Sequence, residues 1–172
     1  MTTTRISLVL AALTSVVVSC GRSDSSRLLS RNAEAAEFIS IVVKDLRYDA
    51  GNPQRRPSAV CYAVFAGPEG FPSNPDKVVL KDCKPVDSSV MSFLIEGLPP
   101  SSDGYVVSVF QDMNLNGKLD TRSLFGVQVP DEPFGFTQNP PLLGAPTYDK
   151  CKIVPQNNGD KFEIVMRKIG GG

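Results

Sequence analysis

The chain has 172 residues, with 18 basic and 18 acidic side chains and no histidine. The balanced charge argues against a nucleic-acid partner, because binding to a polyanion requires an excess of Lys and Arg. The absence of histidine excludes general-base catalysis by histidine, Ser-His-Asp and Cys-His nucleophile pairs, and the usual zinc sites that contain histidine.

Residues 1–19 are typical of a bacterial lipoprotein signal peptide. Arg5 precedes an apolar run over residues 6–18, which is too short to cross a bilayer of about 30 Å as a helix. The run ends in Val-Val-Ser-Cys, so Cys20 is predicted to be diacylated and to become the first mature residue. The alternative is an ordinary cleavable signal in which Cys20 is incidental.

We therefore expect a protein of the bacterial cell envelope that is anchored to the membrane by acyl chains, since two or more chains anchor stably. Gly21 and Arg22 follow the lipidation site. Neither is the Asp that retains many lipoproteins at the inner membrane, which favours the outer membrane.

Removing 19 of the 172 residues leaves 153, enough for one domain with a hydrophobic core. Residues 20–36 are polar without a sustained period and are expected to form a flexible tether. Residues 37–169 carry short apolar runs broken by Gly, Pro, Asn and Asp, which is typical of strands and turns. Seven strands are predicted, at residues 37–46, 57–66, 77–82, 89–97, 105–111, 150–154 and 161–168.

This pattern predicts an all-β domain, a single antiparallel β-sandwich of immunoglobulin-like or prealbumin-like type. Tyr105 opens one of the predicted strands, after two prolines and Gly104. A tyrosine there can return its hydroxyl to nearby backbone, as in the tyrosine corner of sandwich proteins, or it can be an ordinary edge aromatic.

Besides Cys20, the chain has Cys61, Cys83 and Cys151, which allow three pairings in an exported domain. We favour Cys61–Cys83, because this disulfide joins two predicted strands across 22 residues and would contribute about 3 kcal/mol in the chain-entropy model. Cys151 is then unpaired. It is expected to be a buried apolar residue rather than a reactive thiol.

The sequence DMNLNGKLD, residues 112–120, has the spacing of an EF-hand-style calcium loop. Alternate residues supply oxygen around one point, which suits calcium because it prefers several hard oxygen ligands. A glycine, Gly117, fills the position of the sharp turn. The candidate ligands are the side chains of Asp112, Asn114, Asn116 and Asp120, together with the carbonyl of Lys118.

The loop departs from the EF-hand because Ser123 stands where the bidentate Glu is expected and because no helices flank it. A closing ligand must come from elsewhere in the chain, with Glu132 or Asp131 the nearest candidates. We expect weak calcium binding, with a Kd of about 10⁻⁴–10⁻³ M. The alternative is a metal-free turn held by Asn and Asp hydrogen bonds.

The stretch GLPPSSDGYVVSVFQDMNLNGKLDTRSLFGVQVPDEPFGFTQNP, followed by GAPTYDKCKIV, resembles the bacterial domain-of-unknown-function 2141 family of exported proteins. The family pattern runs through a Gly-Tyr strand, D-x-N-x-N-G-x-x-D, G-x-P-x-E-x-x-G-F-S-x-N and G-x-P-x-F. This chain carries the pattern at Asp112, Asn114, Asn116, Gly117, Asp120, Gly126, Pro130, Glu132, Gly135, Phe136, Asn139, Gly144, Pro146 and Tyr148.

The resemblance covers about residues 37–168 and implies a β-sandwich, without supplying an activity. The Cys-containing opening of some members supports the Cys61–Cys83 pairing. The chain departs from the pattern by a longer Gly-to-Pro spacing at residues 127–129, by Thr137 in place of Ser and by Tyr148 in place of Phe.

These observations favour a non-enzymatic, lipid-anchored envelope protein, a structural or binding module with no cofactor beyond calcium. One alternative is a carrier or receptor that takes a small apolar ligand or a protein partner through an exposed Phe134–Phe136 patch, although such aromatics more often fold back over the open end of a sandwich. Another is a hydrolase that uses the carboxylates of Asp112, Asp120 and Glu132.

Overall fold

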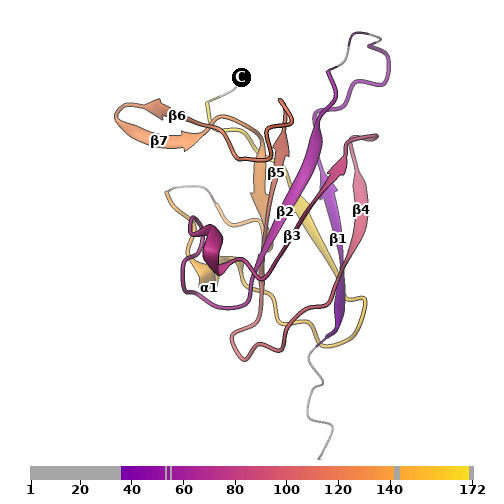
Figure 1. The fold of residues 1–172 in the computed structure, drawn as a ribbon, viewed down its shortest axis with the longest axis vertical. Coiled ribbons are helices and arrows are strands. Elements are labelled where there is room, and N and C mark those ends of the chain that lie inside the picture. The colour runs from indigo at the N-terminus through magenta and orange to yellow at the C-terminus, as the bar shows by residue number, and fades with distance from the viewer. Residues whose placement is uncertain (1–35, 53, 55, 142–143, 171–172) are drawn as a thin grey trace, which may run out of the picture. The chain divides into compact units, whose positions relative to one another are not determined.

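The computed structural model describes residues 36–52, 54, 56–141 and 144–170, so the predicted signal peptide, Cys20 and the tether up to residue 35 lie outside the described residues. The described chain is all-β, as the sequence predicts (Figure 1). No helix in these ranges is long and apolar enough to span a membrane. Its elements are β1 (Phe38–Lys44), β2 (Ala59–Phe65), η1 (Pro75–Lys77), β3 (Leu80–Pro85), β4 (Met91–Glu96), β5 (Val106–Asp112), β6 (Thr121–Leu124), β7 (Val127–Pro130), β8 (Phe134–Phe136), α1 (Tyr148–Cys151) and β9 (Lys161–Val165).

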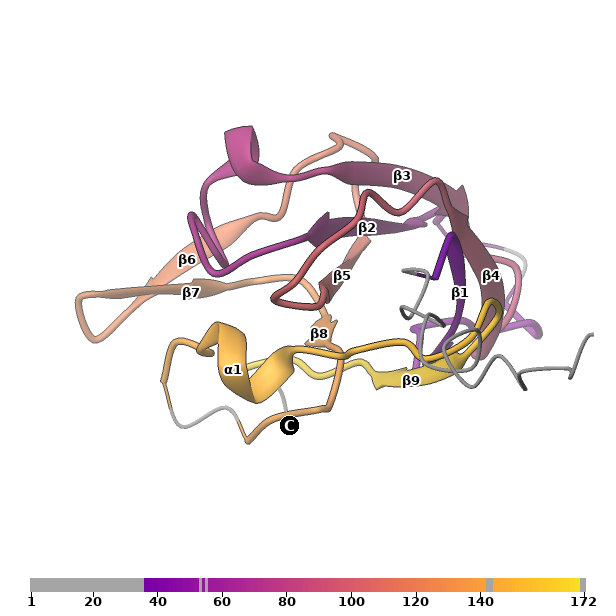
Figure 2. The same cartoon turned by 90° about the horizontal axis from the view of Figure 1, so that it is seen from below.

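The strands form two main sheets, ordered β4-β1-β9 and β3-β2-β5-β8, which lie on either side of the core (Figure 2). A separate two-stranded sheet consists of β6 and β7. The two main sheets meet where Phe134 and Arg167 exchange backbone hydrogen bonds of 2.8 Å in both directions. Pairing is antiparallel throughout the named strands except between β1 and β9, which are parallel and so depart from the predicted all-antiparallel sandwich.

The core lies between the main sheets and follows from the alternation of side chains along each strand. In β1, Ile39, Ile41 and Val43 are fully buried, and Val107 and Val109 of β5 face them from the other sheet. Burying each of these side chains contributes about 1.5–3 kcal/mol. The apolar periodicity of the sequence therefore accounts for the sandwich.

The prediction of a strand at residues 150–154 is wrong. Residues Tyr148–Cys151 form the short helix α1, and Ile153 makes only an isolated bridge to Tyr105. The alternation Lys-Cys-Lys-Ile was interpreted as a strand, but a single helical turn separates polar from apolar side chains here. It buries Tyr148 and Cys151 and leaves Lys150 exposed.

Three short strands, β6, β7 and β8, were not predicted. β8 is three residues long and contains Gly135, a residue that usually weakens a strand. The glycine is required by space: a Cβ there would lie 2.6 Å from Ile164 Cγ2 and 2.9 Å from the Val165 carbonyl oxygen. β8 can therefore fit between β5 and the end of β9 only with this residue.

The predicted disulfide is confirmed, since Cys61 and Cys83 are bonded at directly opposite positions of β2 and β3. Cys151 is fully buried and unpaired, and burial raises the pKa of its thiol to about 11. This thiol stays protonated at neutral pH, in agreement with its interpretation as a buried apolar residue.

The tyrosine-corner interpretation is also confirmed. Tyr105 is buried and its hydroxyl donates to the Pro99 carbonyl at 2.6 Å. A second buried tyrosine, Tyr148, donates to the Gly104 carbonyl at 2.7 Å, and burial raises its pKa to about 12. These two phenols fix the connection into β5, the strand that leads to the candidate site.

Candidate functional site: the loop between β5 and β6

The loop of residues 112–120 begins at the last residue of β5 and ends just before β6, at the end of the sandwich where β1 finishes (Figure 1). Two residues have positive φ, Leu115 at 62° and Gly117 at 73°. The left-handed conformation at Gly117 provides the sharp turn that the calcium-loop pattern requires at this position.

Asp112 organises the backbone of this loop. Its side chain is buried, with Oδ1 accepting hydrogen bonds from the amides of Asn114 at 3.3 Å and Asn116 at 3.1 Å. Its Oδ2 accepts from the Gly117 amide at 2.7 Å. One carboxylate therefore holds three backbone N–H groups of the turn, an arrangement typical of Asp-centred turns.

The other polar side chains of the loop converge on Asp120. The side-chain amide of Asn114 donates to Asp120 Oδ2 at 2.7 Å, and that of Asn116 donates to Oδ1 at 3.0 Å. The amide oxygens of the two asparagines accept from the backbone of Asn116 at 3.2 Å and of Lys118 at 2.8 Å. The loop therefore brings together all four predicted side-chain ligands.

Glu132 reaches the loop from the segment between β7 and β8 and is 5% exposed. Its Oε1 accepts from the Met113 amide at 2.7 Å, and its Oε2 accepts from the Asp120 amide at 3.2 Å. The Glu132 carboxylate therefore bridges the two ends of the loop, at Met113 and Asp120. The other predicted closing ligand, Asp131, points elsewhere and pairs with Arg122 at 3.1 Å and Lys168 at 3.7 Å.

The loop offers carboxylate and amide oxygens, which are the kind of ligand that calcium takes. Within the described ranges, no three Asp, Glu, Cys or His side chains gather closely enough to hold a metal ion by themselves, so a site here depends on the two amides. Each carboxylate or amide oxygen has two lone pairs, so those of Asp112, Asn114, Asn116 and Asp120 retain acceptor capacity beyond the hydrogen bonds described above. With the Lys118 carbonyl these residues offer fewer donors than the six to eight that calcium takes, which leaves positions for water.

A buried glutamine directly before the loop joins β5 to the segment between β1 and β2, and the sequence analysis missed it. Gln111 is fully buried; its Oε1 accepts from the Arg47 amide at 2.8 Å, while its Nε2 donates to the Arg47 carbonyl at 3.0 Å and to Ser58 Oγ at 2.9 Å. The signal was present, because Gln111 continues the alternation of Val107 and Val109 on the inward face of β5.

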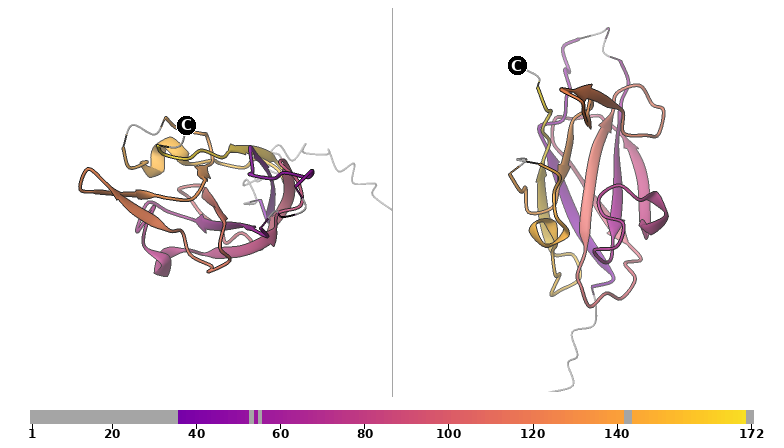
Figure 3. Two further views of the ribbon diagram at one scale, coloured as in Figure 1. Left: turned by 90° about the horizontal axis from the view of Figure 1, so that it is seen from above. Right: turned by 90° about the vertical axis from the view of Figure 1, so that its left-hand side faces the viewer.

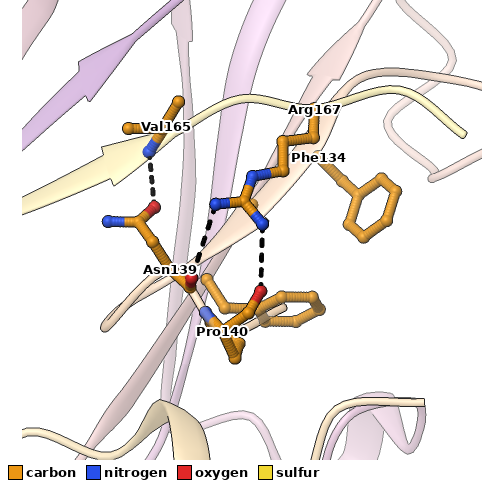
Figure 4. A pocket seen from close by; sticks show the side chains of 7 residues that line it. Phe134, Asn139, Pro140, Val165 and Arg167 are labelled. Atoms are coloured by element: carbon orange, nitrogen blue, oxygen red, sulfur yellow. Dashed lines mark hydrogen bonds between the residues drawn. The ribbon is translucent and has the colours of Figure 1, made fainter. Parts of the chain in front are cut away.

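The Phe134–Phe136 region does not form an exposed aromatic patch. Both rings are buried, which confirms the expectation that they fold back over the sandwich. The cavity beside them is about 10 Å³, room for about one water molecule and far below the roughly 300–1,000 Å³ of ligand pockets. Nearby, Arg167 donates to the Pro140 carbonyl at 3.1 Å, and Asn139 accepts from the Val165 amide at 2.8 Å (Figure 4).

These features define the described chain as an all-β sandwich domain whose loop of residues 112–120 is internally hydrogen-bonded. A family model described as "Uncharacterized protein conserved in bacteria (DUF2141)" matches residues 50–162, from before β2 into β9 and including the whole loop. The chain belongs to this family. No curated protein and no solved structure matches it significantly.

Proposed function

We propose that this protein is a non-enzymatic module of the bacterial cell envelope, anchored by acyl chains on Cys20, whose loop at residues 112–120 binds calcium weakly. The anchor is supported by Arg5, the apolar run over residues 6–18 and the small residue before Cys20. Two acyl chains on this residue suffice for stable attachment, because a single chain gives only marginal, reversible binding.

The observation that carries the calcium proposal is the convergence of Asn114 and Asn116 on Asp120. The side-chain amides of both asparagines donate to the Asp120 carboxylate, whereas the Asp112 carboxylate accepts from three backbone amides of the turn. A cation can therefore replace the two amide groups at Asp120 without loss of the three backbone hydrogen bonds that Asp112 accepts. Calcium would supply a cross-link between the two ends of the loop, and binding to the folded state alone would stabilise it.

The buried polar groups support a non-enzymatic role because they serve the fold. Asp112 and Glu132 accept from backbone amides, and Gln111 and Thr137 bridge backbone groups of different segments. A glycosidase-like hydrolase needs a carboxylic acid held neutral in an apolar pocket and a second carboxylate across a substrate cleft. The carboxylates of this loop instead accept hydrogen bonds from N–H groups of the loop itself.

Isothermal titration calorimetry tests the calcium proposal. The wild-type protein should bind calcium at one site with a Kd of about 10⁻⁴–10⁻³ M. Asp112→Ala should abolish the heat of binding, whereas Asp160→Asn, which changes an acidic turn elsewhere, should leave it unchanged. If the wild type releases no heat of binding up to about 10 mM calcium, a range that covers weak extracellular sites, the calcium proposal fails.

Fractionation tests the anchor separately. Cys20→Ser should move the protein from the membrane fraction to the soluble fraction, because acylation requires the thiol. A Cys20→Ser protein that still requires detergent for extraction would contradict lipid anchoring.

A further inference from the structure

The hairpin of β6 and β7 is an appendage of the sandwich. Its strands pair only with each other, in register from Thr121 with Pro130 to Leu124 with Val127. Figures 1 and 3 show it extending away from the two main sheets. Its base is fixed, since Arg122 pairs with Asp131 at 3.1 Å and donates to the Ile169 carbonyl at 2.9 Å.

The turn of this hairpin places a phenylalanine at the tip. Phe125 and Gly126 are its two central residues, with φ of 50° and 81°, so both adopt the left-handed conformation of a primed turn. Asn-Gly and Asp-Gly are the preferred pairs there, because a bulky residue is strained at positive φ. Phe125 is also 99% exposed, so nothing within the described chain compensates for the strain. An uncompensated outlier of this kind points to a role outside the domain.

Apolar exposure is concentrated in this part of the molecule. Among the described residues, four of the eight exposed large apolar side chains lie between positions 115 and 127. They are Leu115, Leu119, Phe125 and Val127, at 52%, 38%, 99% and 62% exposure. Exposed apolar side chains that are concentrated on one loop and the adjoining hairpin are typical of a surface that binds a protein or a membrane.

The segment that precedes β1 indicates what the exposed apolar hairpin contacts. If Cys20 carries acyl chains, as proposed above, a bilayer is the apolar phase held closest to this domain. The hairpin lies at the end of the sandwich opposite the start of β1 (Figure 1). Residues 21–35 can nevertheless span about 50 Å, roughly twice the length of a seven-residue strand, so the tip lies within reach of the bilayer to which the anchor attaches.

We infer that the β6–β7 hairpin is a membrane-docking element, which inserts Phe125 and the neighbouring Val127 into the interfacial region of a lipid bilayer. The inference rests on the proposed lipid anchor. Insertion removes the apolar tip from water, and it orients the sandwich on the bilayer. The rigid base of the hairpin sets this orientation, because Arg122 holds it against the body.

Single-tryptophan fluorescence tests this inference, because the chain contains no tryptophan. Phe125→Trp is introduced into the full-length lipidated protein, which is reconstituted in vesicles of phosphatidylethanolamine and phosphatidylglycerol with brominated acyl chains. The control is Val154→Trp, since Val154 is 59% exposed and lies in the segment that contacts the start of β1 through the Phe38–Gly159 hydrogen bond.

Both variants should float with the vesicles. The emission of Phe125→Trp should shift to shorter wavelength and be quenched by the brominated chains, whereas Val154→Trp should keep the emission of a water-exposed indole. Floating protein in which Phe125→Trp remains unquenched overturns the inference. Loss of flotation in both variants would contradict the lipid anchor and, with it, the docking inference. Failure of the anchor is therefore distinguishable from failure of the docking inference alone.

Discussion

Two acidic turns of this domain use the same hydrogen-bond chemistry to different extents. In the turn of residues 156–160, Asp160 Oδ2 accepts from the amides of Gln156 at 2.8 Å and Asn157 at 3.1 Å. In the loop of residues 112–120, Asp112 does the same for three amides. A single carboxylate therefore suffices to hold a turn of this kind.

The loop of residues 112–120 carries more polar groups than that purpose requires. The hydrogen bonds that the Asp120 carboxylate accepts come from the side chains of Asn114 and Asn116, and Glu132 adds a further carboxylate behind the loop. These additional side chains, rather than the carboxylate-centred turn itself, are what make the loop of residues 112–120 a candidate ion site.

The largest expected effect is that of Asp112→Ala, which removes a buried carboxylate and leaves three partly buried backbone amides without their acceptor. We expect the free energy of unfolding to fall by about 2–3 kcal/mol, measured by urea denaturation. Asp160→Ala should cost clearly less, since the two hydrogen bonds that its Oδ2 accepts from backbone amides are exposed to water. Equal losses for the two variants would contradict the distinction between the turns.

Glu132→Gln should have the next largest effect. One oxygen remains as an acceptor, so one of the two amides, at Met113 or Asp120, loses a charge-assisted bond, at a cost of about 1–2 kcal/mol. Hydrogen exchange should accelerate at these two amides. Unchanged exchange at both would show that the carboxylate does not tie the ends of the loop.

Asp120→Asn separates the turn from the ion site. Without calcium it should change stability by less than about 1 kcal/mol, because its partners are exposed side chains. At about 10 mM calcium the wild type should gain about 1.4–2.7 kcal/mol, given a Kd of about 10⁻⁴–10⁻³ M. The variant should gain nothing, as measured by urea denaturation with and without calcium. An equal gain in both proteins would place the ion elsewhere.

The smallest expected effect is a pH dependence at Asp160. Hydrogen bonds from the Gln156 and Asn157 amides lower the pKa of its carboxyl from the ordinary 3.8. A lowered pKa in the folded state contributes stability above the unfolded value, and that contribution is lost as the pH falls through the folded value. Urea denaturation between about pH 6 and pH 3 should therefore show a shallower decline below pH 4 in Asp160→Asn than in the wild type. Parallel curves would show that these hydrogen bonds do not favour the charged form.

Much of the fold could be predicted because it depends on local alternation. Strand β5 alternates inward valines, and the loop that follows carries its candidate ligands within nine residues, so both were visible in the sequence. The same reasoning failed at residues 150–154, where one helical turn buries Cys151 as well as a strand would.

The rest of the site depends on contacts between distant segments. That Glu132 lies behind the loop follows from the path of β6 and β7, which were not predicted because each has four residues and their turn contains Phe125 where Asn or Asp is expected. Glu132 could be named as a candidate because it lies near the loop in sequence. That it accepts hydrogen bonds from the Met113 and Asp120 amides could be seen only in the folded structure.

The side-chain amide resonances of Asn114 and Asn116 provide the most direct test, because calcium must displace these two groups from Asp120. Heteronuclear NMR during a calcium titration should show both NH₂ pairs shifting along one saturable curve, while the Asn157 pair beside Asp160 stays in place. Unmoved Asn114 and Asn116 resonances at about 10 mM calcium, well above the expected Kd, would leave the loop a metal-free turn and contradict the account.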